Sequence, residues 1–175
     1  MQKESFKNKV TLITGGAGNI GLETARFLAT QGSHIALLDL TQDKLQDAAA
    51  SLASLGVHVK TYACDVTQNT AVEQCINKVI TDFGHIDYLF NNAGYQGAFA
   101  PIQNYPAEDF ARVMSINVCG AFYVLQAVAR HMVTRNAGGI VNTASMAGVQ
   151  GPPNMAAYGA SRFAIVGLAE TAAKD

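Results

Sequence analysis

The chain has 175 residues, with 12 Lys and Arg against 13 Asp and Glu, so its formal net charge is −1. Only 14% of the residues are charged, against ~25% in a typical soluble domain, and 49% are hydrophobic. This near-neutral balance, without a basic block, argues against nucleic acid or an anionic membrane surface as a partner. The length fits one domain.

Short β-branched runs alternate along the chain with longer segments rich in Ala and Leu, a pattern typical of βαβ units on a parallel sheet. Strands are predicted over residues 10–14, 34–39, 57–63, 86–90 and 140–144. Helices are predicted over residues 20–31, 43–55, 70–83, 110–134 and 155–175. The expected fold is therefore α/β, a doubly wound, Rossmann-like parallel sheet with strand order 3-2-1-4-5.

The end of the chain departs from the pattern of a complete domain. The last predicted helix has no Gly or Pro stop and ends on Asp175, although the dipole favours cations at a helix C-terminus. No strand follows, so the fifth strand would remain an uncovered apolar edge, which complete domains usually avoid. We therefore expect residues 1–175 to form a single domain that is truncated on its C-terminal side.

Neither targeting nor metal binding is indicated by the sequence. No apolar run approaches the ~20 residues of a membrane helix, and residues 1–9 lack the apolar core of a signal peptide. Cys64, Cys75 and Cys119 are odd in number and lack metal-ligand spacing, and the four histidines are scattered. We therefore expect a cytoplasmic protein without a metal site.

A glycine motif follows the first predicted strand. Gly16, Gly18 and Gly21 fit the pattern G-x-G-x-x-G between a strand and a helix. Glycines let the backbone approach a pyrophosphate, whose charge faces the free N–H groups of the helix N-terminus. Asp39 ends the next strand, near the ~20-residue spacing expected for a carboxylate on the adenosine ribose. Taken singly, the motif could be a turn without a ligand and Asp39 a loop cap, but their combination favours a dinucleotide.

Asp39 also bears on the kind of dinucleotide. A carboxylate accepts hydrogen bonds from two ribose hydroxyls but repels a 2′-phosphate. The next residues, Leu40, Thr41 and Gln42, supply no compensating cation. NAD is therefore favoured over NADP.

Further motifs extend along the chain in a recognisable order. They are Thr14-Gly15-Gly16-Ala17-Gly18-Asn19-Ile20-Gly21, Asn91-Asn92-Ala93-Gly94, Asn117, Ser145 and Tyr158-Gly159-Ala160-Ser161-Arg162. Together they resemble the short-chain dehydrogenase/reductase family over essentially the whole chain. Residues 91–112 and 140–160 are most similar to bacterial NAD-dependent xylitol dehydrogenases within it. The resemblance implies oxidation of a secondary alcohol of a polyol to the ketose by hydride transfer, in a homotetramer or homodimer.

The resemblance also implies roles for single residues. The cofactor contacts would be Gly15, Gly18, Asn19, Ile20, Gly21, Asp39, Asp65, Val66, Asn92, Ala93 and Gly94. Tyr158 would exchange a proton with the substrate, and it shares a helix face with Arg162, four residues later. Ser145 would hydrogen-bond the substrate oxygen, and Asn117 would help to hold a water of the proton relay. Taken singly, Tyr158 could be a packing residue and Ser145 a cap.

Two residues depart from the family pattern. Asn19 stands where the family has Gly, but Asn tolerates positive φ better than most residues, so the turn should persist. Arg162 stands where the family has Lys, whose ammonium assists the Tyr and binds the nicotinamide ribose. Arg keeps the charge but is larger and planar, so we expect turnover to fall on the order of 10²-fold or more.

Two other functions remain open. The chain could be a nucleotide-binding or interaction protein that has kept the fold and lost turnover through Arg162 and a missing C-terminal part. A methyltransferase would use a related sheet and an acidic residue at the second strand. It would have no use for Ser145 together with Tyr158, so we rank it last.

Overall fold

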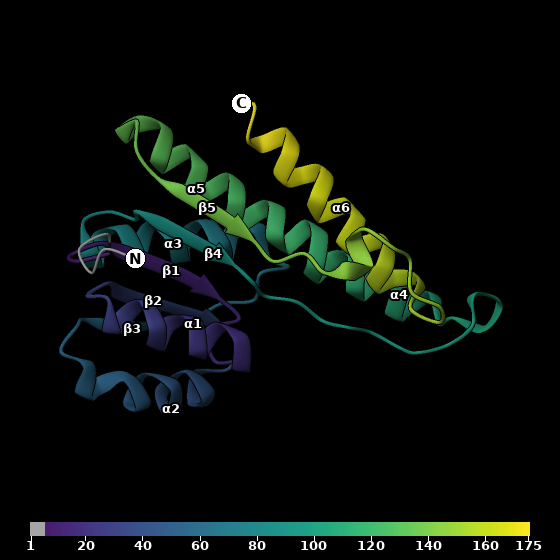
Figure 1. Ribbon diagram of the computed structural model, residues 1–175, viewed down its shortest axis with the longest axis horizontal. Coiled ribbons are helices and arrows are strands. Elements are labelled where there is room, and N and C mark those ends of the chain that lie inside the picture. The colour runs from purple at the N-terminus through teal and green to yellow at the C-terminus, as the bar shows by residue number, and fades with distance from the viewer. Residues whose placement is uncertain (1–5) are drawn as a thin grey trace.

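The computed structural model describes residues 6–175, which form a parallel sheet with helices on both sides (Figure 1). The strands are β1 (Val10–Thr14), β2 (His34–Asp39), β3 (Val59–Ala63), β4 (Tyr88–Asn91) and β5 (Gly139–Asn142). The helices are α1 (Asn19–Thr30), α2 (Gln42–Leu52), α3 (Asn69–Phe83), α4 (Ala107–Met114), α5 (Ala121–Arg135) and α6 (Ala156–Ala172). The sheet order is β3-β2-β1-β4-β5 with every pair parallel, which confirms the predicted fold class.

Burial on both faces explains why the central strands are apolar throughout. All five residues of β1 are buried, and successive side chains point to opposite faces of the sheet. Leu12 packs with the apolar faces of α3 and α5, whereas Ile13 packs with those of α1 and α2. The two cores lie on opposite faces of β1, which is the middle strand of the sheet. The C-terminal end of β1 therefore lies at the centre of the edge where the parallel strands end.

The long helix predicted over 110–134 is continuous but not uniform. It comprises α4, a π-helical segment (Ser115–Gly120) and α5. A π-helical turn contains an extra residue and is frequent at functional sites. Here the segment contains Asn117, whose amide binds the backbone of Tyr95 in the loop after β4. Helical periodicity predicts the helix but not this local widening.

The observed strand boundaries differ from the predicted ones by one or two residues. β4 begins at Tyr88 rather than at residue 86, because the N–H of Ile86 binds the ring of His131 and not a neighbouring strand. β5 ends at Asn142, and the N–H of Thr143 still binds the carbonyl of Asn91. The two strand ends therefore remain joined where the next segments leave the sheet.

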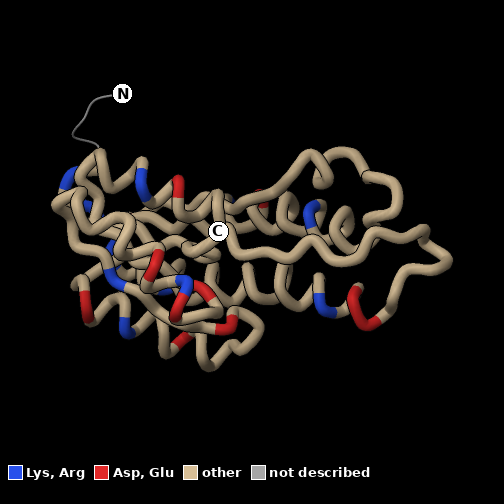
Figure 2. The backbone as a smooth tube through the Cα atoms, turned by 90° about the horizontal axis from the view of Figure 1, so that it is seen from below, with Lys and Arg blue, Asp and Glu red and all other residues tan. Residues whose placement is uncertain are grey.

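By length and composition alone, the continuous helix Ala107–Arg135 could cross a membrane. One side of it, however, packs into the core of the sheet through Val124, Val128 and Met132. This is the arrangement of a core helix. Figure 2 shows acidic and basic residues interspersed along the chain, in agreement with the balanced composition.

We expect protonation of His131 to destabilise the fold as the pH falls from 7 to 5. Nε2 of His131 accepts the Ile86 N–H at 3.3 Å, which requires the neutral ring. Burial, and then the charge of Arg135, lower the pKa of His131, and burial and His58 lower the pKa of His34. A lowered pKa in the folded state means that this stability is present above the unfolded pKa of ~6.5 and is lost as the pH falls.

Thermal unfolding at several pH values tests this expectation. His131→Gln keeps an acceptor without a titrating ring, so its Tm should fall less between pH 7 and pH 5 than that of the unchanged chain. Equal pH dependence of the two proteins would contradict the assignment to His131.

Candidate functional site

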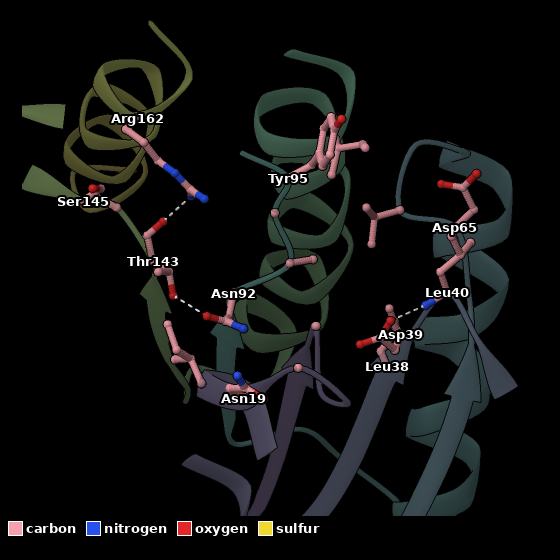
Figure 3. Close-up of a pocket in the computed structure, with 18 of the residues that line it drawn as sticks. Asn19, Leu38, Asp39, Leu40, Asp65, Asn92, Tyr95, Thr143, Ser145 and Arg162 are labelled. Atoms are coloured by element: carbon pink, nitrogen blue, oxygen red, sulfur yellow. Dashed lines mark hydrogen bonds between the residues drawn. The ribbon is translucent and has the colours of Figure 1, made fainter. Parts of the chain in front are cut away.

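A cavity of about 730 Å³ lies beyond the C-terminal ends of the strands (Figure 3). β1 lies between β2 and β4, so the chain order of the sheet reverses at its centre. Open parallel sheets bind ligands at such a point. Figure 3 shows that Asp39 and Asp65 lie on one side of this cavity, whereas Ser145 and Arg162 lie on the other.

The glycine turn leads from β1 into α1 at the floor of the cavity. Gly15 has a φ of 64°, in the left-handed region that favours glycine. A Cβ on Gly21 would collide with the carbonyl oxygen of Gly15, so α1 can pass this close to the turn only with Gly at 21. The exposed start of α1 then offers free backbone N–H groups to an anion.

Asn19 fits this turn for a reason other than the expected one. It is the first residue of α1 and is not among the residues with positive φ. The left-handed conformation is required at Gly15 instead, so Asn19 needs no special tolerance. The turn persists, as predicted, with Asn at this position.

The carboxylate of Asp39 is held in place by two backbone groups. Oδ2 accepts the N–H of Ala17 at 3.0 Å, and Oδ1 accepts the N–H of Leu40 at 2.8 Å. A carboxylate has about four acceptor positions, so both oxygens can accept further hydrogen bonds from a ligand. The neighbouring Leu40 is exposed and lines the same cavity. This end suits a diol, and the described residues that line it include no Lys or Arg that could bind a phosphate.

Asp65 and Val66 line the same end of the cavity, just after β3. Oδ1 of Asp65 accepts hydrogen bonds from both the backbone N–H and the side-chain hydroxyl of Thr67. These two bonds fix the loop that follows β3. Val66 is buried against the π-helical segment, where a Cβ on Gly120 would lie 2.8 Å from Cγ2 of Val66. Val66 therefore forms a fixed apolar wall.

The loop after β4 is tied to the strands on both sides. Oγ1 of Thr14 accepts the N–H groups of Asn92 and Ala93 at 2.8 and 2.9 Å. The hydroxyl of Thr143 donates to Oδ1 of Asn92 at 3.2 Å. These bonds hold Ala93 and Gly94 at the middle of the cavity, between its two ends.

Asn117 lies behind the cavity rather than in its lining. Its Oδ1 accepts the N–H of Tyr95 at 2.7 Å, and its Nδ2 donates to the carbonyl of Tyr95 and to Oγ of Ser161. Ser161 in turn donates to the carbonyl of Tyr158. Asn117 thus joins the loop after β4 to the helix that carries Tyr158.

Ser145 has both of the roles considered from the sequence. Its Oγ accepts the N–H of Ala147 at 3.1 Å and so caps the short helix Met146–Gly148. The same side chain lines the cavity, together with the half-buried ring of Tyr158. Because the cap uses Oγ as an acceptor, the hydroxyl proton of Ser145 remains able to donate to a ligand.

The Arg162 guanidinium joins three parts of the site. Nη1 donates to the carbonyl of Thr143 at 2.8 Å, and the guanidinium carbon lies 4.8 Å from the centre of the Tyr158 ring. A Cβ on Gly94 would lie 2.6 Å from Nη2, so a larger residue at position 94 would force the guanidinium to shift. Among residues 6–175, the buried Nε of Arg162 has no hydrogen-bond partner.

The structure brings most of the residues chosen from the sequence into one cavity. Only Gly21 and Asn117 of that set do not line it, and both support residues that do. The sequence analysis did not select these further lining residues: Leu38, Leu40, Cys64, Tyr95, Ile116, Thr143 and Ala144. Most of them lie at or just beyond strand ends, and the rule that ligands bind there could have identified them.

Comparisons with known proteins agree with this geometry. The family model described as short chain dehydrogenase matches residues 9–175. Levodione reductase of Leifsonia aquatica is 35% identical, over 97% of this chain and 64% of its own. D-Threitol dehydrogenase of Mycolicibacterium smegmatis is 36% identical, over 95% of this chain and 64% of its own.

A solved structure is more similar still. The crystal structure of NAD+-bound xylitol dehydrogenase is 60% identical, with a TM-score of 0.97, and the match covers 98% of this chain and 66% of that one. This chain therefore spans about two thirds of the length of the relatives that it matches. The family match over nearly the whole chain, the sheet order and the cavity lead to one conclusion: the chain belongs to the short-chain dehydrogenase family.

Proposed function

We propose that this chain holds the cofactor-binding and catalytic part of an NAD-dependent dehydrogenase that oxidises a secondary alcohol of a polyol, such as xylitol, to the ketose. The observation that carries the proposal is the composition of the cavity. A fixed carboxylate, Asp39, lies at one end, and Ser145, Tyr158 and Arg162 lie at the other. We propose that residues 1–175 form a single dinucleotide-binding and catalytic domain.

The residues present fit NAD. Gly15 and Gly21 form a turn that a Cβ would fill, next to the free N–H groups of α1, which suits a pyrophosphate. Asp39 retains acceptor positions for the adenosine ribose hydroxyls, and Asp65 and Val66 lie where an adenine would rest. Asn92, Ala93 and Gly94 would contact the middle of the cofactor. The NAD+-bound state of the similar xylitol dehydrogenase structure supports this assignment.

Three side chains supply the chemistry at the other end of the cavity. NAD, when bound, accepts the hydride from the carbinol carbon of the substrate. Ser145 donates its hydroxyl proton to the substrate oxygen and orients it. Tyr158 removes the hydroxyl proton, acting as general base, and the guanidinium of Arg162 lies 4.8 Å from the centre of its ring. Loss of one hydride and one proton converts the secondary alcohol to a ketone.

Asn117 supports this arrangement from behind. Its hydrogen bonds fix the carbonyl of Tyr95 and, through Ser161, the start of α6. We propose that Asn117 acts on the proton relay through these contacts and through a water held beside them. The substrate would be a polyol or, in the reverse direction, a ketose, in keeping with the similar xylitol and threitol dehydrogenases.

Asp39→Asn should change the choice of cofactor. We expect the affinity for NAD to fall about 10-fold or more, because hydrogen bonds to a charged acceptor are worth ~1.5–3 kcal/mol. The affinity for NADP should hold or rise, because the repulsion of the 2′-phosphate is removed. Titration calorimetry with both cofactors gives the two dissociation constants.

The exposed carboxylate of Asp43, in the first turn of α2, provides a matched control. Asp43→Asn should leave both affinities unchanged. An equal loss of NAD and NADP affinity in Asp39→Asn would mean that Asp39 only supports the glycine turn, and it would contradict the cofactor assignment.

A nucleotide-binding protein with impaired turnover is the second candidate. The observation that favours it is the engagement of Arg162. Its Nη1 binds the carbonyl of Thr143, and its buried Nε has no hydrogen-bond partner in the part of the chain that the structure describes. Such a protein would bind NAD without forming NADH from any polyol. Single-turnover measurements at high protein concentration distinguish the two candidates.

The remaining assignments complete the proposal. We propose a cytoplasmic enzyme that acts on a small molecule and forms a homotetramer or homodimer, without a nucleic-acid or membrane partner. The near-neutral charge of −1 and the interspersed charges of Figure 2 support the last point.

A further inference from the structure

Gly148 lies where the segment that carries Ser145 meets the helix that carries Tyr158. It is the last residue of the short helix Met146–Gly148 and is buried. A Cβ on Gly148 would lie 2.7 Å from the carbonyl oxygen of Arg162 and 2.9 Å from its carbonyl carbon. Atoms in favourable contact lie about 3.5–4.0 Å apart, so this position has no room for a side chain.

The backbone conformation of Gly148 does not explain why this residue is a glycine. Gly148 closes a helical turn and is not among the glycines with positive φ. An alanine could therefore adopt the same backbone angles. The atoms that a Cβ would meet belong to the backbone of α6, which cannot turn aside as the end of a flexible side chain can. What the glycine allows is the close approach of two backbone segments.

This contact links the two parts of the site that face the substrate. The N–H of Gly148 binds the carbonyl of Ser145 at 2.8 Å, and Oγ of Ser145 accepts the N–H of Ala147 at 3.1 Å. Across the contact, Arg162 lies one turn after Tyr158 on α6. Figure 3 shows Ser145 and Arg162 on the same side of the cavity. A change of spacing at Gly148 would therefore move Ser145 relative to Tyr158.

We propose that Gly148 is a positioning residue, which sets the distance between Ser145 and Tyr158 by letting their two segments touch. The inference rests on the proposed function, in which both side chains contact the same substrate oxygen. An alanine at 148 would force the segments apart by roughly 0.5–1 Å. A misplacement of about 1 Å can reduce a rate by on the order of 10²-fold.

Kinetics of Gly148→Ala test the effect on catalysis. We expect kcat for polyol oxidation to fall about 10-fold or more, because Ser145 and Tyr158 no longer reach one oxygen together. The dissociation constant of NAD should change less than about twofold, because Gly148 does not line the cavity and lies far along the chain from Asp39. A general loss of structure would instead weaken NAD binding as well.

Two other glycines provide matched controls. Gly151 follows in the same loop and Gly167 lies on α6, and neither has a positive φ. A Cβ at either position would meet no atom of the rest of the described chain within 4 Å. Gly151→Ala and Gly167→Ala should therefore keep the kcat of the unchanged chain. An equal loss of kcat in Gly151→Ala would contradict the role of the contact.

A double variant separates the backbone contact from side-chain crowding. A Cβ on Gly148 would also lie 3.2 Å from Cγ2 of Val166. Adding Val166→Ala to Gly148→Ala removes this crowding and favours folding, but it leaves the carbonyl of Arg162 in place. The kcat should therefore stay low. Recovery to the value of Val166→Ala alone would overturn the proposal.

Crystal structures of the unchanged chain and of Gly148→Ala measure the spacing directly. We expect the Cα atoms of residues 145 and 158 to lie roughly 0.5–1 Å farther apart in the variant. If neither protein forms NADH from any polyol, the proposed function fails, but this distance still decides the inference. An unchanged distance would overturn it, as would an unchanged kcat of Gly148→Ala where the unchanged chain forms NADH.

Discussion

Tyr158→Phe is expected to lower kcat for polyol oxidation by about 10³-fold, within the range for loss of a general base. The change removes only the phenolic oxygen. The ring would keep its place beside the guanidinium of Arg162, 4.8 Å away, so the cavity should retain its shape. The dissociation constant of NAD should therefore change less than about twofold. NADH absorbance gives kcat, and calorimetry gives the affinity.

A second tyrosine provides the control. Tyr123 lies on α5, partly buried against the core and outside the cavity lining. Tyr123→Phe should leave kcat unchanged. If Tyr158→Phe retained more than about a tenth of the activity, Tyr158 would not be the general base.

Arg162→Lys is expected to raise kcat about 10²-fold. Lys carries a compact charge with three donors on a flexible stem. In Arg162, by contrast, one donor is fixed on the carbonyl of Thr143, and the buried Nε has no partner among the described residues 6–175. The smaller head would also free space next to Gly94, where Nη2 now packs. A positioned cation at this point is worth on the order of 10²-fold in rate.

The test compares kcat of the two proteins in the same background. Arg26→Lys, on the exposed face of α1, is the matched exchange and should have no effect. Arg162→Met, which keeps bulk without charge, should be slower than the unchanged chain. If Arg162→Lys were no faster than the unchanged chain, Arg162 would not be what limits turnover.

Much of the site follows from sequence because the C-terminal ends of parallel strands share one edge. Asp39, Asp65, Asn92 and Ser145 each come at or just after a strand, so correct strands bring them together. The close contact between Gly15 and Gly21 could not be predicted from residue spacing or from the G-x-G-x-x-G motif alone. That contact depends on how closely α1 crosses the turn.

Contacts between side chains from distant segments could not be predicted in this way. The bond from Arg162 to Thr143 depends on how α6 lies over the end of β5. The link from Asn117 to Ser161 depends on the π-helical segment, for which the apolar periodicity gives no signal. These features follow from packing distances, which periodicity does not encode.

Formation of NADH from NAD and xylitol tests the central claim most directly. We expect absorbance of NADH to rise with xylitol, with one ketose formed per NADH, faster in Arg162→Lys and nearly abolished in Tyr158→Phe. Measurement of NADH formation with other polyols that contain a secondary alcohol would define the substrate range. Binding of NAD without NADH from any polyol, in both the unchanged chain and Arg162→Lys, would contradict the claim.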